Sequence, residues 1–243
     1  MLRNNFWASE LLNRFPEVSH GFVSAPLSFN LSLNFKNMKS AILFYRFTKI
    51  PFRNWVFAEQ IHGDSFRYID DKKNLIFPKI VHKTDALLTS EKGRIIVMFF
   101  ADCFPIYVYS PKIPLVGLIH SGWRGALKRL PFKVVQEMLT QYDLHPNEIY
   151  LAVGPGIQNC CFQVKEDFIE KLSEEDKKYL EERENSFYFD LPSFITSQFW
   201  DLNIPKENVD LSGICTKCNL NFYSYRRDKT KDRNIGFIYI RRG

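Results

Sequence analysis

The chain has 243 residues, of which 45% are hydrophobic and 25% charged, a globular composition long enough to bury a full core. Its longest uninterrupted apolar run, residues 95–101, is far shorter than the roughly 20 residues that span a bilayer, which argues against a membrane protein. The net charge of +6 favours anionic ligands such as phosphate or loose nucleic-acid contact, but no basic stripe or motif predicts a specific nucleic acid.

The N-terminal part of the chain carries one basic residue of interest. His20–Ser24 is typical of a short strand, Leu31–Asn34 alternates polar and apolar residues, and Lys39–Thr48 has helical spacing. Arg46 lies on or beside the apolar face of that predicted helix. A snorkelling side chain and an anion-binding one are about equally favoured there.

A candidate metal ligand follows the next predicted strand. Trp55–Ile61 predicts a strand, and His62 stands at its end before a glycine, although a lone His is more often structural. Thr84–Thr89 predicts another strand, with Asp85 near its start. Asp85 either orients a histidine ligand or caps a turn, and the cap is slightly favoured.

The centre of the chain predicts three strands in succession, at Arg94–Phe100, Pro105–Ser110 and Leu115–His120. Cys103 would then sit in the sharp link between the first two strands, and His120 at the end of the third. Adjacent strands can bring these side chains together although they are far apart in sequence. The pair would serve either as metal ligands or as a nucleophile and its base.

The second half predicts mostly helices. The expected elements are a helix at Pro131–Tyr142, a strand at Glu148–Val153, helices at Lys165–Asn185 and Leu191–Leu202, and a last strand at Gly236–Ile240. The core-facing stripe of the first helix is expected to be Phe132, Val135, Met138, Leu139 and Tyr142. No repeat, low-complexity tract or clear linker divides the chain, so we expect one domain over residues 1–243.

Five cysteines are present, and four of them lie in the second half of the chain. The adjacent residues Cys160-Cys161 are more typical of a buried small residue and its neighbour than of a functional pair. Cys215-Thr216-Lys217-Cys218 has the spacing of half a zinc site or a redox pair, but no second such pair completes a zinc ribbon. Since Met1–Leu12 has no apolar core typical of a signal peptide, we expect a reduced, cytoplasmic setting.

His62, Cys103 and His120 form the most informative set. Each follows a strand and has Gly or Pro close by. Three nitrogen and sulfur ligands with an open fourth position are how catalytic zinc sites are built, and the same donors also suit copper.

Four motifs follow one another along the chain: Gln60-Ile61-His62-Gly63, Thr84-Asp85-Ala86-Leu87, Ala101-Asp102-Cys103-Phe104-Pro105 and His120-Ser121-Gly122-Trp123-Arg124-Gly125. In these motifs and their order the chain resembles the bacterial YfiH-like family, whose members are described as multicopper polyphenol oxidases (laccases) and as purine nucleoside phosphorylases, and to which FAMIN is related. The resemblance continues through Gly154-Pro155-Gly156-Ile157, Cys160-Cys161-Phe162, Cys215-Thr216 and Tyr223-Ser224-Tyr225-Arg226-Arg227-Asp228. It covers nearly the whole chain. Two departures are a loop without glycine over residues 24–30 and Phe100 in place of a smaller polar residue.

The resemblance implies a mixed α/β fold with layered β-sheets flanked by helices. It also implies metal ligation by His62, Cys103 and His120, and phosphorolysis of adenosine, inosine and methylthioadenosine, with adenosine deamination as a further activity. Catalytic roles fall to Cys103, His120 and Asp85. The candidates for binding nucleoside or phosphate are Asn34, Arg46, Gln60, Trp123, Arg124, Arg226 and Arg227.

Three other functions compete with a zinc nucleoside enzyme. A cysteine hydrolase or deamidase would use Cys103 as nucleophile and His120 as base, without metal. A copper oxidase would need more ligands than the five histidines supply, and no Met adjoins the three residues in sequence. A basic nucleic-acid-binding module is the least favoured function, because the chain lacks a recognisable motif for it.

Overall fold

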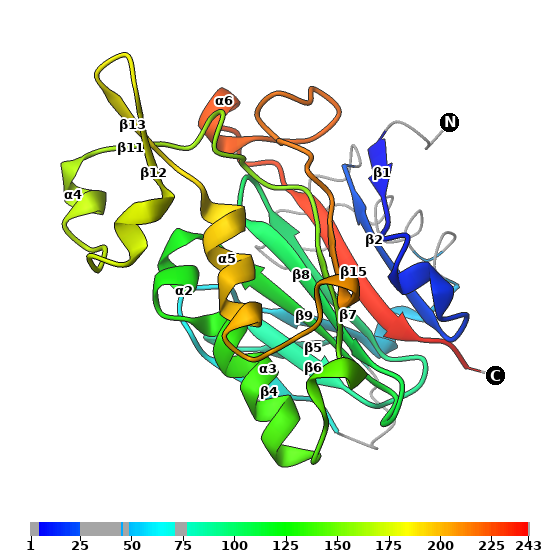
Figure 1. Cartoon of the computed structure of the whole chain (residues 1–243). Helices are drawn as coiled ribbons and strands as arrows, with labels where there is room; N and C mark the ends of the chain where they lie inside the picture. Colours follow the sequence, from blue (N-terminus) through cyan, green and yellow to red (C-terminus); the bar gives the residue numbers. More distant parts are fainter. Residues whose placement is uncertain (1–4, 25–44, 46–48, 71–76, 243) are drawn as a thin grey trace.

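The computed structural model describes residues 5–24, 45, 49–70 and 77–242 (Figure 1). Most of the helix expected at Lys39–Thr48, and with it Arg46, lies outside the described residues, as does Asn34. Among the described helices, none combines the length and apolar character needed to cross a membrane.

Two six-stranded sheets form the body of the molecule. The first has the order β1 (Phe6–Trp7), β2 (Val18–Val23), β15 (Asn234–Ile240), β7 (Ile95–Phe100), β3 (Trp55–Ala58) and β5 (Lys79–Val81). The second has the order β14 (Val209–Leu211), β10 (Tyr150–Val153), β8 (Phe104–Ser110), β9 (Leu115–Ser121), β6 (Ala86–Thr89) and β4 (Phe66–Tyr68). Both sheets are mixed, since β3 runs parallel to its two neighbours and β10 runs parallel to β14.

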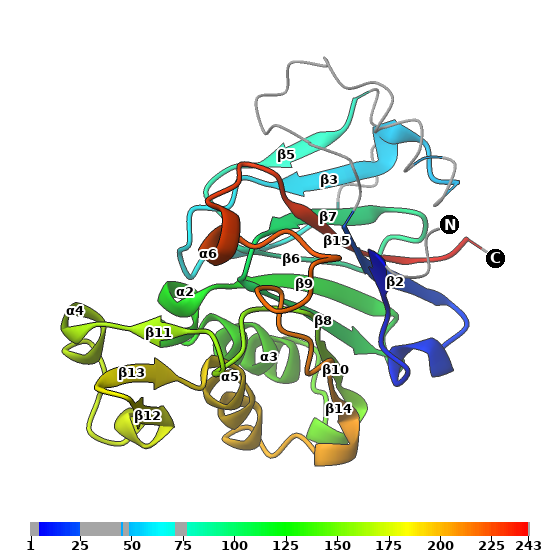
Figure 2. The ribbon, with the colours of Figure 1, turned by 90° about the horizontal axis from the view of Figure 1, so that it is seen from above.

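The sheets and helices stack as three layers, which Figure 2 shows edge-on. Helices α2 (Trp123–Leu127), α3 (Leu130–Gln141) and α5 (Leu191–Trp200) cover the outer face of the second sheet. The period of two in each strand divides its side chains between the layers. In β9, Leu115 and Ile119 face the helices, whereas Val116 and Leu118 face the first sheet. The expected mixed α/β fold with layered sheets and flanking helices is therefore confirmed.

The helices begin where their sequences supply a cap or a break. Asp190 caps α5, because its carboxylate accepts a hydrogen bond from the Ser193 N–H at 3.1 Å. Arg129, with a φ of 58°, separates α2 from α3, and Pro131 stands in the first turn of α3. The buried face of α3 is Leu130, Pro131, Val134, Val135 and Met138, so Phe132, Leu139 and Tyr142 of the expected stripe are only partly buried.

The helix expected over Lys165–Asn185 is wrong for most of its length. This segment holds the short helix α4 (Glu166–Ile169) and the strand β12 (Leu180–Arg183). Glu184 and Asn185 both have positive φ, and the tight turn they form pairs β12 with β13 (Ser186–Phe189). The strand β11 (Gln163–Val164) completes a three-stranded sheet, which projects from one end of the molecule with α4 (Figure 1).

The remaining elements are short. Helix α6 (Tyr225–Asp228) precedes β15 and is capped by the Ser224 hydroxyl, which accepts a hydrogen bond from the Arg227 N–H at 3.1 Å. Single turns of 3-10 helix lie at Leu12–Arg14, Phe52–Asn54, Pro146–Glu148, Asp176–Tyr179 and Lys206–Asn208.

Candidate active site

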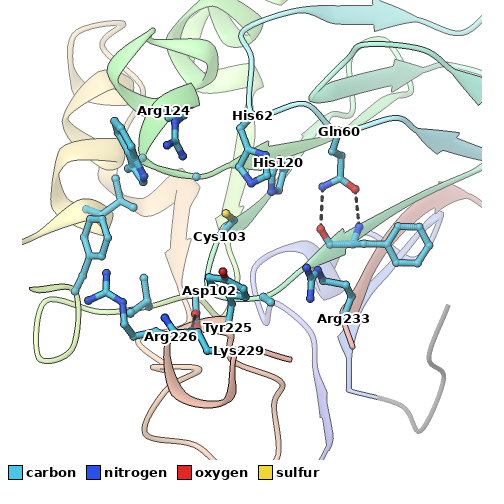
Figure 3. Close-up of a pocket in the computed structure, with 17 residues that line it drawn as sticks. Gln60, His62, Asp102, Cys103, His120, Arg124, Tyr225, Arg226, Lys229 and Arg233 are labelled. Atoms are coloured by element: carbon cyan, nitrogen blue, oxygen red, sulfur yellow. Dashed lines mark hydrogen bonds between the residues drawn. The ribbon is translucent and has the colours of Figure 1, made fainter. Parts of the chain in front are cut away.

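Three side chains with metal-binding atoms meet at the junction of the two large sheets. His62 lies in the turn after β3, Cys103 immediately precedes β8, and His120 lies near the end of β9. Their ligand atoms all lie within 4.8 Å of one another, and the two imidazole rings are 4.8 Å apart between centroids. Figure 3 shows the Cys103 sulfur directed toward both rings. The structure therefore brings the three residues predicted from the sequence together in one cluster.

The strand period explains why Cys103 and His120 meet. Pro105 pairs with His120 in the β8–β9 hairpin. Tyr107 and Leu118 face the first sheet, and so must Cys103 and His120, which are displaced from them by even numbers of residues. The His120 ring also lies 5.4 Å from the Phe100 ring of β7 between centroids.

Asp85 holds two parts of this cluster in place. One carboxylate oxygen lies 2.8 Å from Nδ1 of His120, which leaves Nε2 of that ring as its ligand atom. The same carboxylate accepts hydrogen bonds from the backbone N–H groups of Ile61, His62 and Gly63 at 3.2, 3.0 and 2.7 Å. His62 has a φ of 59°, a conformation that these bonds stabilise. Asp85 thus both orients a histidine and caps a turn.

Interactions within the cluster favour the charged forms of Cys103 and His120. Burial opposes ionisation of the Cys103 thiol, but His120 and His62 interact with the thiolate and lower its pKa to about 6. Burial also disfavours the charged form of His120, yet Cys103 and Asp85 raise its pKa to about 9. A thiolate beside an imidazolium is the arrangement in which a metal cation can replace the proton of the ring.

The space around the Cys103 sulfur depends on Gly122. A Cβ atom at this position would lie 2.7 Å from the Cys103 sulfur and 3.5 Å from Cδ2 of His62. A side chain at residue 122 would therefore displace the thiol from the histidines.

The side chains of His62, Cys103 and His120 line a cavity of about 570 Å³. Four cationic side chains line it, from Arg124, Arg226, Lys229 and Arg233. In Figure 3 these cations lie on several sides of the central cysteine. Its apolar or aromatic lining residues are Phe99, Ala101, Trp123, Ile157, Phe162, Leu191 and Tyr225.

Two of the cations have no hydrogen-bond or ion-pair partner within the described part of the chain. The Arg124 guanidinium lies over the Trp123 ring at 4.2 Å, and the Lys229 ammonium lies over the Tyr225 ring at 4.9 Å. A cation–π contact leaves the N–H groups of each cation available to an anionic ligand.

Other predicted binding residues are already engaged. Gln60 lines the cavity, but its side-chain amide donates to the Phe99 carbonyl at 2.8 Å and accepts from the Phe99 N–H at 2.9 Å. Arg226 donates to the Gln163 carbonyl at 2.9 Å. Arg227 does not line the cavity, because its guanidinium binds Asp228 and the carbonyls of Thr216, Lys217, Asn219 and Phe222. Its predicted role as a phosphate ligand does not fit this position.

Asp102 was missed as a functional residue by the sequence interpretation. It has a φ of 79° and lines the cavity beside Cys103. Its carboxylate accepts hydrogen bonds from the Thr216 hydroxyl at 2.7 Å and from the Arg226 N–H at 2.6 Å. Its conformation and contacts connect the β7–β8 turn to the segment around α6. Lys229 and Arg233 were also missed, since no pattern in the sequence distinguishes them from surface cations.

A family model described as "Multi-copper polyphenol oxidoreductase laccase" matches residues 15–241. The chain belongs to this family. That assignment confirms the resemblance seen in the motifs around His62, Cys103 and His120.

Two named relatives extend this result. The chain is 33% identical over 199 residues to "Purine nucleoside phosphorylase YlmD" of Geobacillus stearothermophilus, which covers 77% of this chain and 73% of that protein. It is 29% identical over 201 residues to "Purine nucleoside phosphorylase" of Borreliella burgdorferi, covering 74% of this chain and 85% of that protein.

Solved structures of the family share the fold. The crystal structure of YfiH, a hypothetical protein of Bacillus licheniformis, matches with a TM-score of 0.86 at 26% identity, covering 98% of this chain and 97% of that one. The crystal structure of YlmD from Geobacillus stearothermophilus matches with a TM-score of 0.84 at 27% identity, covering 94% and 93%.

Cys215 and Cys218 lie beside a second pair of thiols, although the sequence has no second pair with their spacing. Cys160 and Cys161 lie beside them, and all four sulfur atoms fall within 4.8 Å of one another. The sequence interpretation looked for a second pair with the same spacing, whereas the fold supplies two adjacent residues instead.

Proposed function

We propose that this protein is a purine nucleoside phosphorylase whose catalytic metal, zinc, is held by His62, Cys103 and His120. The observation that carries the proposal is that these three groups open into a cavity lined by Arg124 and Lys229, which have no hydrogen-bond or ion-pair partner among the described residues. Relatives named purine nucleoside phosphorylases support the same reaction. Copper remains the alternative metal, because one thiolate and two imidazoles suit both ions.

The cavity has the size and lining of a small-molecule site. Its volume of about 570 Å³ falls within the roughly 300–1,000 Å³ typical of such sites. The rings of Trp123, Phe162 and Tyr225 offer apolar walls for a purine. The cations supply the charge that phosphate needs, and the proposed substrates are adenosine, inosine and methylthioadenosine together with phosphate.

Phosphorolysis exchanges one bond at the sugar for another. A phosphate oxygen forms a bond to C1′ while the bond from C1′ to N9 of the purine breaks, and the electron pair stays on the base. Arg124 and Lys229 would hold the phosphate beside the sugar, with Arg226 and Arg233 adding positive charge around it. Their contribution is orientation and electrostatic stabilisation of an anionic reactant.

The residues around the proposed ligands keep the ligand side chains in position. Asp85 fixes the ring orientation of His120, and Gly122 leaves room for the Cys103 sulfur. When bound, a zinc ion would supply Lewis acidity at the open ligand position. The same position next to a purine ring would account for adenosine deamination as a further activity.

The proposal extends to the setting of the enzyme. We infer one catalytic domain over residues 1–243 acting in the reducing cytoplasm, where thiol ligands stay reduced. The five cysteines are free in the structure, which supports this inference.

The test is release of free base from inosine and adenosine with and without phosphate. We expect release with phosphate, and the sugar phosphate as the second product. Equal release in both conditions would replace phosphorolysis by hydrolysis. Arg124→Ala should raise the KM for phosphate, whereas Arg129→Ala should not, because the Arg129 guanidinium is paired with Asp201 at 2.6 Å.

A cysteine hydrolase is the second candidate function. Hydrogen bonds connect Cys103, His120 and Asp85 in space, because the His120 ring bonds to the Cys103 sulfur on one side and to the Asp85 carboxylate on the other. This is the order of a nucleophile, its base and an orienting acid. A hydrolase would survive chelation and be inactivated by alkylation of Cys103, whereas the zinc enzyme should lose activity on chelation.

A further inference from the structure

A second cluster of metal-binding atoms lies apart from the cavity. The Cys218 sulfur lies 3.3 Å from that of Cys161 and 3.8 Å from that of Cys160. With Cys215 included, the four sulfur atoms lie within 4.8 Å of one another, and none belongs to a disulfide. None of these residues lines the candidate active site.

We propose that Cys160, Cys161, Cys215 and Cys218 bind a structural zinc ion as four thiolates. In a tetrahedral site with zinc–sulfur bonds of about 2.3 Å, neighbouring sulfur atoms are about 3.8 Å apart. The separations of 3.3 and 3.8 Å lie close to this value. A disulfide would need a sulfur–sulfur distance of about 2.05 Å. The inference does not depend on the reaction proposed above.

The backbone around Cys215 is arranged to stabilise a thiolate. The N–H groups of Gln158, Lys217 and Cys218 hydrogen-bond to the Cys215 sulfur. Such donors favour a charged sulfur over a neutral thiol. Two of them come from the Cys215–Cys218 turn itself, and the third comes from the loop that carries Cys160 and Cys161.

The ion would join two loops that follow neighbouring strands. β10 and β14 run parallel, and beyond their ends Gly156 and Cys215 form an isolated bridge. The first loop carries Cys160 and Cys161, and the second carries Cys215 and Cys218. Four thiolate ligands leave no open position, which is typical of a structural site rather than a catalytic one.

The same loops supply walls of the candidate active site. Ile157 and Phe162 flank the first cysteine pair, and Tyr225 and Arg226 follow the second. Arg226 also reaches back to the first loop, where it donates to the Gln163 carbonyl. A zinc ion that holds the two loops together would therefore fix the shape of one side of the cavity.

The exposure of the four residues allows loading from solvent. Cys160 and Cys218 are exposed, whereas Cys161 and Cys215 are buried. A substitution at Cys218 therefore removes a ligand with little loss of packing. Cys218→Ser is the variant of choice, and Cys103→Ser is its matched control because it makes the same change in the other cluster.

The experiment measures zinc per chain after purification in reducing buffer. We expect two zinc ions in the wild type, one in Cys218→Ser, and one in the double variant His62→Ala/His120→Ala. Cys218→Ser should also lower the Tm by several degrees and raise the KM for nucleoside more than it lowers kcat. A double variant without zinc, or a Cys218→Ser protein that keeps as much zinc as the wild type, would overturn the proposal.

Cobalt substitution gives a second measurement, which is made first on the wild type. Thiolate-to-cobalt charge transfer grows with the number of sulfur ligands, so this cluster should give a stronger band than the cluster with one cysteine. Cys103→Ser should keep the strong band. A four-thiolate site would be contradicted if the strong charge-transfer band were absent from cobalt-loaded wild type. A disulfide among these four cysteines in freshly reduced protein would contradict it as well.

Discussion

The Asp85 carboxylate lies 2.8 Å from Nδ1 of His120 and also binds three backbone N–H groups around His62. One buried side chain thus sets the position of two proposed metal ligands that come from different sheets. Because Asp85 acts on both residues, loss of its carboxylate is expected to lower metal affinity more than loss of a single hydrogen bond would.

Asp85→Asn should weaken zinc binding by about 10–100-fold, the usual effect of removing such a partner of a ligand. The amide can accept fewer of the N–H bonds and no longer stabilises a charged His120. Competition with a chromophoric chelator measures the affinity. Asp64→Asn is the control, since that carboxylate is paired with Lys133 at 2.7 Å on the surface. Equal zinc affinity in Asp85→Asn and wild type would remove Asp85 from this role.

His62→Ala, Cys103→Ala and His120→Ala should each lose the zinc ion of this site and phosphorolysis together, because three ligands leave none to spare. Chelation should inactivate the wild type, and added zinc should restore it. His82→Ala serves as the control, because His82 is an exposed histidine outside the cluster whose ring lies 3.0 Å from the Glu59 carboxylate. A Cys103→Ala protein with full zinc and no activity would favour the hydrolase instead.

Gly122→Ala should reduce metal content although it alters no ligand. Its Cβ would lie 2.7 Å from the Cys103 sulfur, which must then move away from the histidines. Gly117→Ala is the matched control, because its Cβ would press on Leu88 in the second sheet. The control should lose stability and keep its zinc, as measured by thermal unfolding and metal analysis. Full zinc in Gly122→Ala would show that the sulfur can adjust.

Metal-free protein should have an unusually reactive Cys103. Burial opposes the thiolate, but His120 and His62 lower the pKa of Cys103 to about 6. Iodoacetamide should therefore label it with a midpoint near pH 6, and His120→Ala should move the midpoint upward. Peptide mapping separates Cys103 from Cys160, whose thiol has a pKa raised by burial to about 11. A Cys103 midpoint at or above pH 8 in metal-free protein would contradict the ion pair.

Acid should destabilise the protein through His20. Burial lowers the pKa of His20 to about 4, and its Nε2 accepts a hydrogen bond from the Ser9 N–H at 2.8 Å, which requires the neutral ring. Between about pH 6.5 and 4 the unfolded state binds more protons at this residue, so stability falls as the pH falls. The loss approaches about 3 kcal/mol below pH 4. Denaturant unfolding of wild type and His20→Gln measures it, and equal pH dependence would exclude His20 as the cause.

The sequence predicted best where one physical pattern dominates. Strands such as β7 and β9 were predicted clearly, because both faces of each are buried and the runs Ile95–Phe100 and Leu115–Ile119 are apolar apart from Gly117. β12 was missed because its exposed, charged residues pair through a turn of Glu184 and Asn185, and charge is equally common on a helix.

Membership of a family motif pointed to some of the residues that line the cavity, but Asp102 was missed although it lies in one of these motifs. His62, Cys103 and His120 were found in this way, and Asp85 was left between two roles that the structure combines. Arg227 was assigned to phosphate because sequence cannot tell that loop carbonyls occupy its guanidinium. The pairing of Cys160 and Cys161 with Cys215 and Cys218 depends on the parallel contact of β10 and β14, which local spacing does not encode.

The position of β15 has a consequence for when the active site can form. This strand, Asn234–Ile240, lies inside the first sheet between β2 and β7, while β3, which leads into His62, pairs with the other edge of β7. When His62, Cys103 and His120 have been translated, β15 has not, and so the first sheet, which carries His62 and which Cys103 and His120 face, is still incomplete. A metal ion held by these three residues would therefore find its complete site only after residue 240 has been translated, and the nascent chain would have to reach that point without it.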